Sequence, residues 1–259
     1  MEKIYVKIKR RNNPNADSYW EDFQVPKKPG MNVVSALMEI RKNPVNARGI
    51  ATTPVVWEAA CLEEVCGSCT MVINGKVGQA CSALIDRLDQ PITLEPMKKF
   101  PVVRDLVVDR SKIFDALKRV KAWIPIDGAH GMGGTHSVGG PNNPVPGPRV
   151  TETERIISHD LACCIACGAC LEACPQVNDK SPFIGAAAIN QVRLFNRHPI
   201  GRLHRDSRLE ALMGEGGIDD CGNAQNCVRA CPKEIPLTES IAEVGREVTK
   251  YAVGKLLGR

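Results

Sequence analysis

Four of the twelve cysteines in this 259-residue sequence form a group whose spacing could do chemistry. The group reads Cys61-x4-Cys66-x2-Cys69-x11-Cys81. Three thiolates from one tight loop and a distant fourth are the plant-type spacing that holds a [2Fe–2S] cluster. Gly67 lies between the ligands, where a small residue lets backbone N–H groups approach cluster sulfur. The alternative is a structural zinc site held by four thiolates, which more often uses two separate pairs.

Two further cysteine runs follow in the second half of the sequence. The first reads Cys164-x2-Cys167-x2-Cys170-x3-Cys174-Pro175, the bacterial ferredoxin run in which the fourth Cys serves the other cluster. The second reads Cys221-x5-Cys227-x3-Cys231-Pro232 and has the same spacing, except that Ala224 replaces the second Cys. The two runs therefore supply one thiolate fewer than two [4Fe–4S] clusters need.

The exchange of fourth ligands divides these thiolates into two predicted sites. A [4Fe–4S] site would use Cys164, Cys167, Cys170 and Cys231. The other site would keep only Cys174, Cys221 and Cys227, so the iron corner opposite Ala224 has no thiolate and a [3Fe–4S] cluster is predicted. The alternative is a [4Fe–4S] cluster whose fourth iron uses water or another side chain such as Asp220.

The remaining polar residues indicate no catalytic site within this chain. Cys163 is left over and is expected to be a small buried apolar residue. The five histidines share no metal-ligand spacing, and there is no nucleotide-binding fingerprint or nucleophilic constellation. Iron–sulfur clusters move single electrons, so three of them predict an electron wire. We expect the organic chemistry in a partner that carries a two-electron cofactor.

Composition narrows the class of protein further. The sequence is 43% hydrophobic and 24% charged with a net charge of +5, which excludes collagenous, coiled-coil and wholly disordered chains. This positive net charge is too small to predict a nucleic-acid partner. No secretory signal or membrane span is evident, so a reducing compartment is expected, where metal sites are more common than disulfide frameworks.

Two domains are predicted, at 1–104 and 105–259. The first reads as a small α+β unit with a strand at Ile4 to Ile8, another at 19–25, a helix at 32–42, a hairpin turning at Asn74-Gly75, and a short strand at 92–94. The second reads as mainly α-helical. Helices are predicted at 111–123, 186–196, 207–213 and 239–257, and a further helix is predicted to begin at a capping box formed by Thr151 and Glu154. A Gly- and Pro-rich loop is expected at 127–148.

These motifs closely resemble the iron–sulfur subunit of succinate:quinone oxidoreductase (succinate dehydrogenase) and quinol:fumarate reductase. The likeness covers nearly the whole sequence and includes LMEIRKNPVN at 37–46, EPMKKFPVVRDLVVD at 95–109, and the runs 61–75 and 221–236. The stretches AWIPIDG and RLEALMGEGG are similar to the menaquinone-linked bacterial branch in particular.

The resemblance implies an N-terminal β-grasp plant-type [2Fe–2S] ferredoxin domain followed by a mainly α-helical bacterial-type ferredoxin domain. Electrons would pass from the FAD of a succinate-oxidising flavoprotein subunit through the [2Fe–2S], [4Fe–4S] and [3Fe–4S] clusters. They would reach a quinone near the last cluster, at a cytochrome b membrane anchor that holds haem b. The chain would be peripheral, on the cytoplasmic face of the bacterial inner membrane.

Two departures concern the quinone. Ubiquinone-using relatives have a Trp shortly after the first Cys-Pro, but Pro175 is followed by QVNDKSPF. They often have a His after the first Cys of the last run, where Gly222 stands here. These differences favour menaquinone. Other interpretations are a quinol:fumarate reductase subunit, a subunit of another flavin dehydrogenase, a free-standing soluble ferredoxin and a zinc module that only binds partners.

Overall fold

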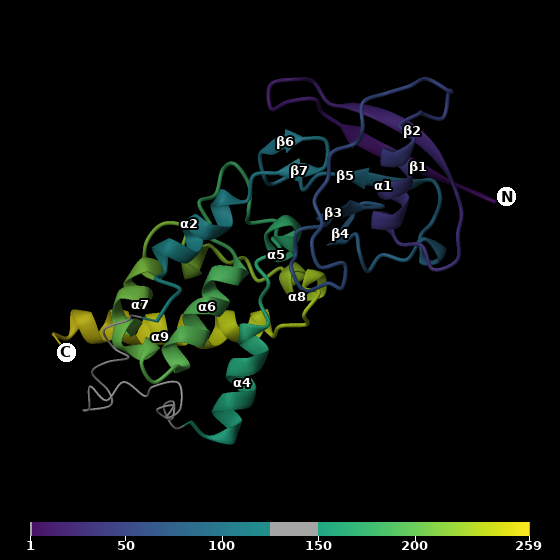
Figure 1. The fold of residues 1–259 in the computed structure, drawn as a ribbon. Helices are drawn as coiled ribbons and strands as arrows, with labels where there is room; N and C mark the ends of the chain where they lie inside the picture. The colour runs from purple at the N-terminus through teal and green to yellow at the C-terminus, as the bar shows by residue number, and fades with distance from the viewer. Residues whose placement is uncertain (1, 125–149, 259) are drawn as a thin grey trace, which may run out of the picture. The chain divides into compact units, whose positions relative to one another are not determined.

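The computed structural model describes residues 2–124 and 150–258, which form two compact units (Figure 1). The first unit comprises Met1–Lys112, Ile165–Ala173 and Ala230–Pro232, and the second comprises Ile113–Cys164, Cys174–Arg229 and Lys233–Arg259. The predicted loop at 127–148, with its two histidines, lies outside the described residues. The predicted domain boundary after residue 104 stays a prediction.

A five-stranded mixed sheet lies at the centre of the first unit (Figure 1). Its strand order is β2-β1-β5-β3-β4, with β1 and β5 parallel and the other pairs antiparallel. The strands are β1 Lys3–Arg10, β2 Tyr19–Pro26, β3 Thr70–Ile73, β4 Lys76–Gln79 and β5 Ile92–Glu95. Together with helix α1, Val33–Lys42, this sheet agrees with the predicted β-grasp arrangement.

Alternating side chains bury one face of the sheet against α1. Ile4, Val6 and Ile8 of β1 are at most 2% exposed, because successive residues of a strand point to opposite faces. The helix contributes a buried stripe that includes Leu37 and Ile40, and its N-terminus is capped by the side chain of Asn32. The predicted strand and helix are thus confirmed, and their apolar periodicity builds the core on which the cysteine loop rests.

The predicted hairpin is present between β3 and β4. Ile73 pairs with Lys76, so Asn74 and Gly75 form a two-residue turn. Both turn residues have positive φ, at 47° and 78°, which is the type I′ geometry that matches the twist of two antiparallel strands. This turn fixes the register of the two strands.

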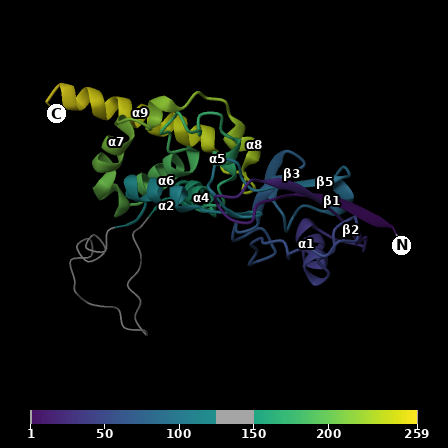
Figure 2. The same cartoon turned by 90° about the horizontal axis from the view of Figure 1, so that it is seen from above.

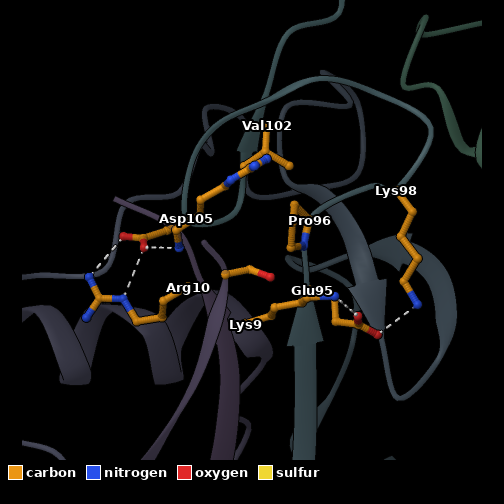
Figure 3. Close-up of a pocket in the computed structure, with 9 residues that line it drawn as sticks. Lys9, Arg10, Glu95, Pro96, Lys98, Val102 and Asp105 are labelled. Atoms are coloured by element: carbon orange, nitrogen blue, oxygen red, sulfur yellow. Dashed lines mark hydrogen bonds and ion pairs between the residues drawn. The ribbon is translucent and has the colours of Figure 1, made fainter. Parts of the chain in front are cut away.

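A buried ion pair ties the end of β1 to the segment that leaves the sheet. Arg10 and Asp105 are both fully buried, and the guanidinium donates two hydrogen bonds of 3.1 and 3.0 Å to the carboxylate. They line a pocket of about 200 Å³ in which Lys9 and Lys98 both pair with Glu95 (Figure 3). Asp105 lies between two short paired strands, β6 Val102–Arg104 and β7 Val107–Val108. These charged side chains pair with one another and stabilise the local fold.

Helices make up the second unit, seen from above in Figure 2. The longer ones are α2 Ser111–Arg119, which begins in the first unit, α4 Glu152–Ala162, α6 Ala186–Arg197, α7 Arg205–Met213 and α9 Leu237–Leu256. Short elements are η2 Gly201–His204, η3 Ile218–Asp220 and α8 Asn226–Ala230, which ends in the first unit, where η1 Ile85–Arg87 and α5 Ala169–Ala173 lie. The helices predicted at 186–196, 207–213 and 239–257 are confirmed within two residues.

The central helix α6 packs against α4, α7 and α9. Its buried Asn190 donates to the carbonyl of Leu161 at 3.0 Å and accepts from the hydroxyl of Ser240 at 3.1 Å. Near its end, Arg197 pairs with Glu154 and Glu243, each at 2.7 Å. One face of α6 therefore links α4 and α9 through paired polar groups rather than apolar contacts alone.

One predicted helix end needs correction. α2 begins at Ser111 as predicted, and the carboxylate of Asp109 accepts the N–H of Ser111 at 2.8 Å. The helix ends at Arg119 and not near Trp123. The buried guanidinium of Arg208 binds the carbonyls of Lys121 and Trp123 at 3.0 Å each, which holds this stretch in a turn. Of the predicted capping box, Thr151 does accept the N–H of Glu154, at 3.2 Å.

Candidate metal centres

The loop that carries Cys61 wraps its backbone around the thiol sulfur. The N–H groups of Glu63, Val65 and Cys66 point at Cys61 Sγ over 3.5, 3.2 and 3.2 Å. Leu62 and Glu64 adopt left-handed φ values of 63° and 60°, which turn the chain tightly enough for this convergence. Three backbone donors aimed at one sulfur are the arrangement that hydrogen-bonds a cluster-ligating thiolate.

Backbone N–H groups also point at the sulfur of Cys66. The backbone N–H of Ser68 lies 3.4 Å from Cys66 Sγ. Hydrogen bonding, first from the Ser68 side chain and then from the backbone, lowers the pKa of Cys66 to about 6. A thiol with this pKa is largely ionised at neutral pH and ready to bind a cation.

Cys69 and Cys81 form a second, buried pair. The hairpin of β3 and β4 brings them together: Cys69 precedes β3, Cys81 follows β4, and the N–H of Ala80 donates to the carbonyl of Cys69 at 3.1 Å. Burial, together with the neighbouring Cys81 thiol, raises the pKa of the Cys69 thiol to about 11. The Cys69 thiol therefore ionises at neutral pH only with a metal beside it, because a coordinating cation removes the thiol proton outright.

The position of Gly67 requires glycine, because it combines a left-handed backbone with no room for a Cβ. Its φ is 71°, and a Cβ added there would lie 2.7 Å from Cys167 Cβ and 2.9 Å from Cys167 Cα. Its carbonyl accepts from the hydroxyl of Thr70 at 2.7 Å and from Arg110 Nη1 at 2.7 Å. The loop between two ligands of the first group is therefore in direct contact with a residue of the second group, within one compact unit.

The segment that carries Cys167 and Cys170 is anchored by a carboxylate. Both cysteines are buried; Cys167 precedes α5 and Cys170 lies within it. Glu172 of α5 accepts the backbone N–H groups of Lys98 and Lys99, each at 3.0 Å. Cys231 belongs to the same unit, and Cys164 directly precedes the segment that begins at Ile165.

Cys174, Cys221 and Cys227 line one pocket of the second unit. Burial raises the pKa of Cys227, and the thiols of Cys174 and Cys221 also raise it. Ala224 lines the same pocket and presents a methyl group there. The pocket thus brings together the three thiolates predicted for one site, with an unreactive side chain in the fourth position.

Asp220, the alternative fourth ligand, is engaged elsewhere. Its carboxylate accepts the N–H of Gly216 at 2.7 Å, and it is not among the residues lining the pocket. Gln176 does line the pocket and lies over Gly222, where an added Cβ would collide with its amide.

Cys163 differs from its prediction. It is half-buried rather than buried, and it caps the C-terminus of α4, with its N–H directed to the carbonyls of His159 and Asp160. The backbone position decides its role, because the last helical carbonyls need donors.

Sequence reasoning did not identify Arg110, Thr70 or Glu172. Each acts on backbone groups, which leave no residue-type signal; those of Arg110 and Glu172 belong to distant segments, and that of Thr70 lies three residues away. In the part of the chain that the structure describes, no three His, Cys, Asp or Glu side chains are close enough to hold a single metal ion. Over the same residues, no helix combines the length and apolar character needed to cross a bilayer.

Two known families match the two halves of the chain. A family described as a 2Fe-2S iron-sulfur cluster binding domain matches residues 5–115, and one described as a 4Fe-4S dicluster domain matches residues 160–235. These matches favour iron–sulfur sites over the zinc alternative. They cover the described cysteine loop, the α5 segment and the pocket of Cys227.

Whole-length relatives agree with this division. The succinate dehydrogenase iron-sulfur subunit of Bacillus subtilis is 56% identical over 97% of this chain and 94% of its own. The fumarate reductase iron-sulfur subunit of Wolinella succinogenes is 28% identical over 89% of this chain and 90% of its own. A chain of the Mycobacterium smegmatis Sdh1 complex in the apo form has the same fold, with a TM-score of 0.72, 20% identity and 96% coverage of both chains.

Proposed function

The chain belongs to the family of succinate dehydrogenase iron–sulfur subunits, and from this premise we propose that it conducts single electrons from a flavoprotein subunit to a quinone. The flavoprotein partner carries FAD and oxidises succinate to fumarate. The quinone is reduced at a cytochrome b anchor that holds haem b. This chain itself binds neither succinate nor FAD.

Three ligand sets carry the function. Cys61, Cys66, Cys69 and Cys81 hold a [2Fe–2S] cluster, and Cys164, Cys167, Cys170 and Cys231 hold a [4Fe–4S] cluster. Cys174, Cys221 and Cys227 hold a [3Fe–4S] cluster. The sequence spacing supports all three sets, and the shared pocket of Cys174, Cys221 and Cys227 supports the third most directly.

The protein's own groups fit this chemistry. Bound clusters supply one-electron transfer, and the chain supplies thiolates, backbone donors and a dry surrounding that set how favourable each transfer is. The N–H groups around Cys61 and Cys66 stabilise negative charge on the outer pair of sulfurs. Burial of Cys69 and Cys81 excludes water from the inner pair.

The observation that carries the proposal is the contact between Gly67 and Cys167. It joins the first ligand loop to a ligand of the second set inside one compact unit. Electron tunnelling weakens exponentially with distance, so two ligand loops in van der Waals contact are the arrangement that a relay between clusters requires.

Menaquinone is the quinone that the second unit favours. Pro175 is followed by QVNDKSPF and Cys221 by Gly222, so the Trp and His that ubiquinone-using relatives contribute are both missing. The chain is held through its anchor on the cytoplasmic face of a bacterial plasma membrane. The resemblance of the cysteine runs to the membrane-bound complexes supports this location.

The reverse direction, quinol-driven fumarate reduction, is the second candidate. The likeness to the Wolinella fumarate reductase subunit favours it, because the same ligand sets conduct electrons either way. The 56% identity to a succinate dehydrogenase subunit supports succinate oxidation as the main direction.

Purification of the tagged chain from solubilised membranes tests the proposal. We expect a flavin-containing subunit and a haem-containing subunit to co-purify, with iron and inorganic sulfide in the amounts that three clusters require. The preparation should reduce a menaquinone analogue with succinate as donor. A preparation that contains the clusters and flavin but is inert to both succinate and fumarate would contradict the substrate assignment.

A further inference from the structure

Arg110 holds the loop between Cys66 and Cys69 from outside the motif. It lies two residues after β7, and its side chain is 16% exposed. Its Nη1 donates to the carbonyl of Gly67 at 2.7 Å, and its Nη2 donates to the carbonyl of Ser68 at 2.6 Å. The planar guanidinium fork can bind two adjacent carbonyls at once, which a lysine ammonium cannot do with the same geometry.

One of these carbonyls belongs to the peptide that faces the cluster ligand. The peptide group between Gly67 and Ser68 has its oxygen on Arg110 and its N–H on Cys66 Sγ, 3.4 Å away. Hydrogen bonds in series polarise one another, so a cation on the oxygen makes the N–H a stronger donor to sulfur. Arg110 therefore acts on Cys66 through this peptide.

The charge of Arg110 is weakly neutralised. The carboxylate recorded near it is that of Glu58, whose Oε2 lies 4.0 Å from Nη2 and whose side chain is 51% exposed. An exposed pair at this separation screens little of the guanidinium charge from its other neighbours. A fixed positive charge thus lies one peptide away from a ligand.

The loop has other supports besides Arg110. The hydroxyl of Thr70 also donates to the Gly67 carbonyl at 2.7 Å, and Cys167 packs against the Gly67 Cα. The loop should therefore keep its fold when Arg110 is replaced.

We propose that Arg110 is a positioning residue that raises the reduction potential of the [2Fe–2S] cluster held by the loop. The inference rests on the proposed function, because it takes Cys61, Cys66, Cys69 and Cys81 as the ligands. Reduction adds negative charge to the cluster. A nearby cation and a strengthened N–H···S hydrogen bond both favour the reduced form.

An EPR-monitored redox titration of the cluster-loaded complex tests this role. We expect Arg110→Gln to weaken reduction of the [2Fe–2S] cluster about tenfold in equilibrium constant, which is 59 mV for one electron. Arg110→Lys keeps the charge but loses one of two carbonyl contacts, so its potential should fall between those of the wild type and Arg110→Gln.

Arg119→Gln is the matched control. Arg119 of α2 also donates to two backbone carbonyls, those of Ala211 at 2.9 Å and Glu215 at 2.6 Å, but it lies in the second unit. Its replacement should leave the [2Fe–2S] potential unchanged.

The results of this titration can contradict either the role of Arg110 or the proposed function. An unchanged potential in Arg110→Gln at full cluster content would overturn the inference, as would an equal fall in Arg119→Gln. If Arg110→Gln does not retain the cluster, Arg110→Lys decides, and a wild-type potential there overturns the role. Absence of a [2Fe–2S] signal from the reduced wild type would instead contradict the proposed function.

Discussion

Ala224 is the side chain that decides the type of cluster in the second unit. It lines the pocket of Cys174, Cys221 and Cys227 at the position that the ferredoxin spacing gives to a fourth cysteine. A methyl group cannot bind iron, so the cubane corner opposite it has no protein thiolate.

Replacing this methyl group should change the cluster. We expect Ala224→Cys to convert the [3Fe–4S] cluster to [4Fe–4S], with loss of the three-iron EPR signal from the oxidised protein. Ala224→Val also enlarges the side chain, but without a thiolate, and should keep that signal. A three-iron spectrum unchanged in Ala224→Cys would contradict the ligand assignment.

The close contact of Gly67 with Cys167 leads to a second prediction, about stability. Gly67→Ala combines an unfavourable φ with a Cβ only 2.7 Å from Cys167 Cβ. Gly75→Ala is the matched control, because its φ is 78° but nothing lies within 4 Å. Thermal unfolding of the cluster-loaded chain should show Gly75→Ala costing about 1 kcal/mol and Gly67→Ala clearly more. Equal melting shifts in the two variants would mean that the contact with Cys167 carries no constraint.

At the scale of elements, α5 depends on its carboxylate anchor. Glu172 receives two backbone N–H groups, and Glu172→Gln leaves one oxygen to do so and removes the charge. We expect a local loss of about 1 kcal/mol, because one of two N–H groups in this partly exposed site loses its charged acceptor. Hydrogen exchange at the amides of Lys98 and Lys99 should speed up.

Asp115→Asn is the control for this change. Asp115 pairs with Lys118 on the exposed face of α2, where ion pairs contribute little. Exchange at Lys98 and Lys99 should be unaffected there. Wild-type protection in Glu172→Gln would show that the anchor is dispensable.

The turn from α6 into η2 should respond to pH. His198 Nδ1 accepts the N–H groups of Ile200 and Gly201 at 3.2 Å each, and burial lowers the pKa of His198 below its ordinary 6.5. The unfolded chain therefore takes up this proton first. The stability that His198 contributes is present above pH 6.5 and is lost as the pH falls through the folded value.

The His198→Asn variant tests this response. Its side-chain oxygen can accept the same N–H groups and does not titrate. Between pH 8 and pH 5, the melting temperature of the wild type should fall by about 2 °C more than that of the variant. His204→Asn, which replaces a second histidine of this region, should track the wild type. Parallel pH curves for wild type and His198→Asn would contradict the role.

Local sequence patterns predict much of the fold because the relevant physics is local. The Asn74-Gly75 turn dictates its hairpin, and the hairpin explains why Cys81 can lie so far from Cys69 in sequence. The contacts of Arg110 and Glu172 could not be predicted in this way. They join groups 42 to 74 residues apart, and their acceptors and donors are backbone atoms, which leave no residue-type signal.

The predicted end of α2 is wrong for a related reason. The apolar spacing of 111–123 favours a longer helix, but the buried Arg208 claims the carbonyls of Lys121 and Trp123 from 85 to 87 residues away. A tertiary cation thus overrides helical propensity. Cys163 was misjudged because its place at the end of α4 determines its exposure.

At the scale of the whole molecule, the cysteines are divided between the two compact units. The first unit contains all four cysteines of the first set together with Cys167, Cys170 and Cys231, and the second contains Cys164, Cys174, Cys221 and Cys227. The exchange of fourth ligands between the ferredoxin runs thus takes Cys231 to the first unit and leaves Cys174 in the second. Chain crossings of this kind require both runs to fold together.

Low-temperature EPR of the native membrane complex tests the central claim most directly. We predict a near-isotropic three-iron signal in the oxidised complex. On addition of succinate, this signal should disappear and a reduced [2Fe–2S] signal should replace it. A fully metallated complex without the three-iron signal would contradict the assignment of Cys174, Cys221 and Cys227, and clusters that succinate cannot reduce would contradict the function.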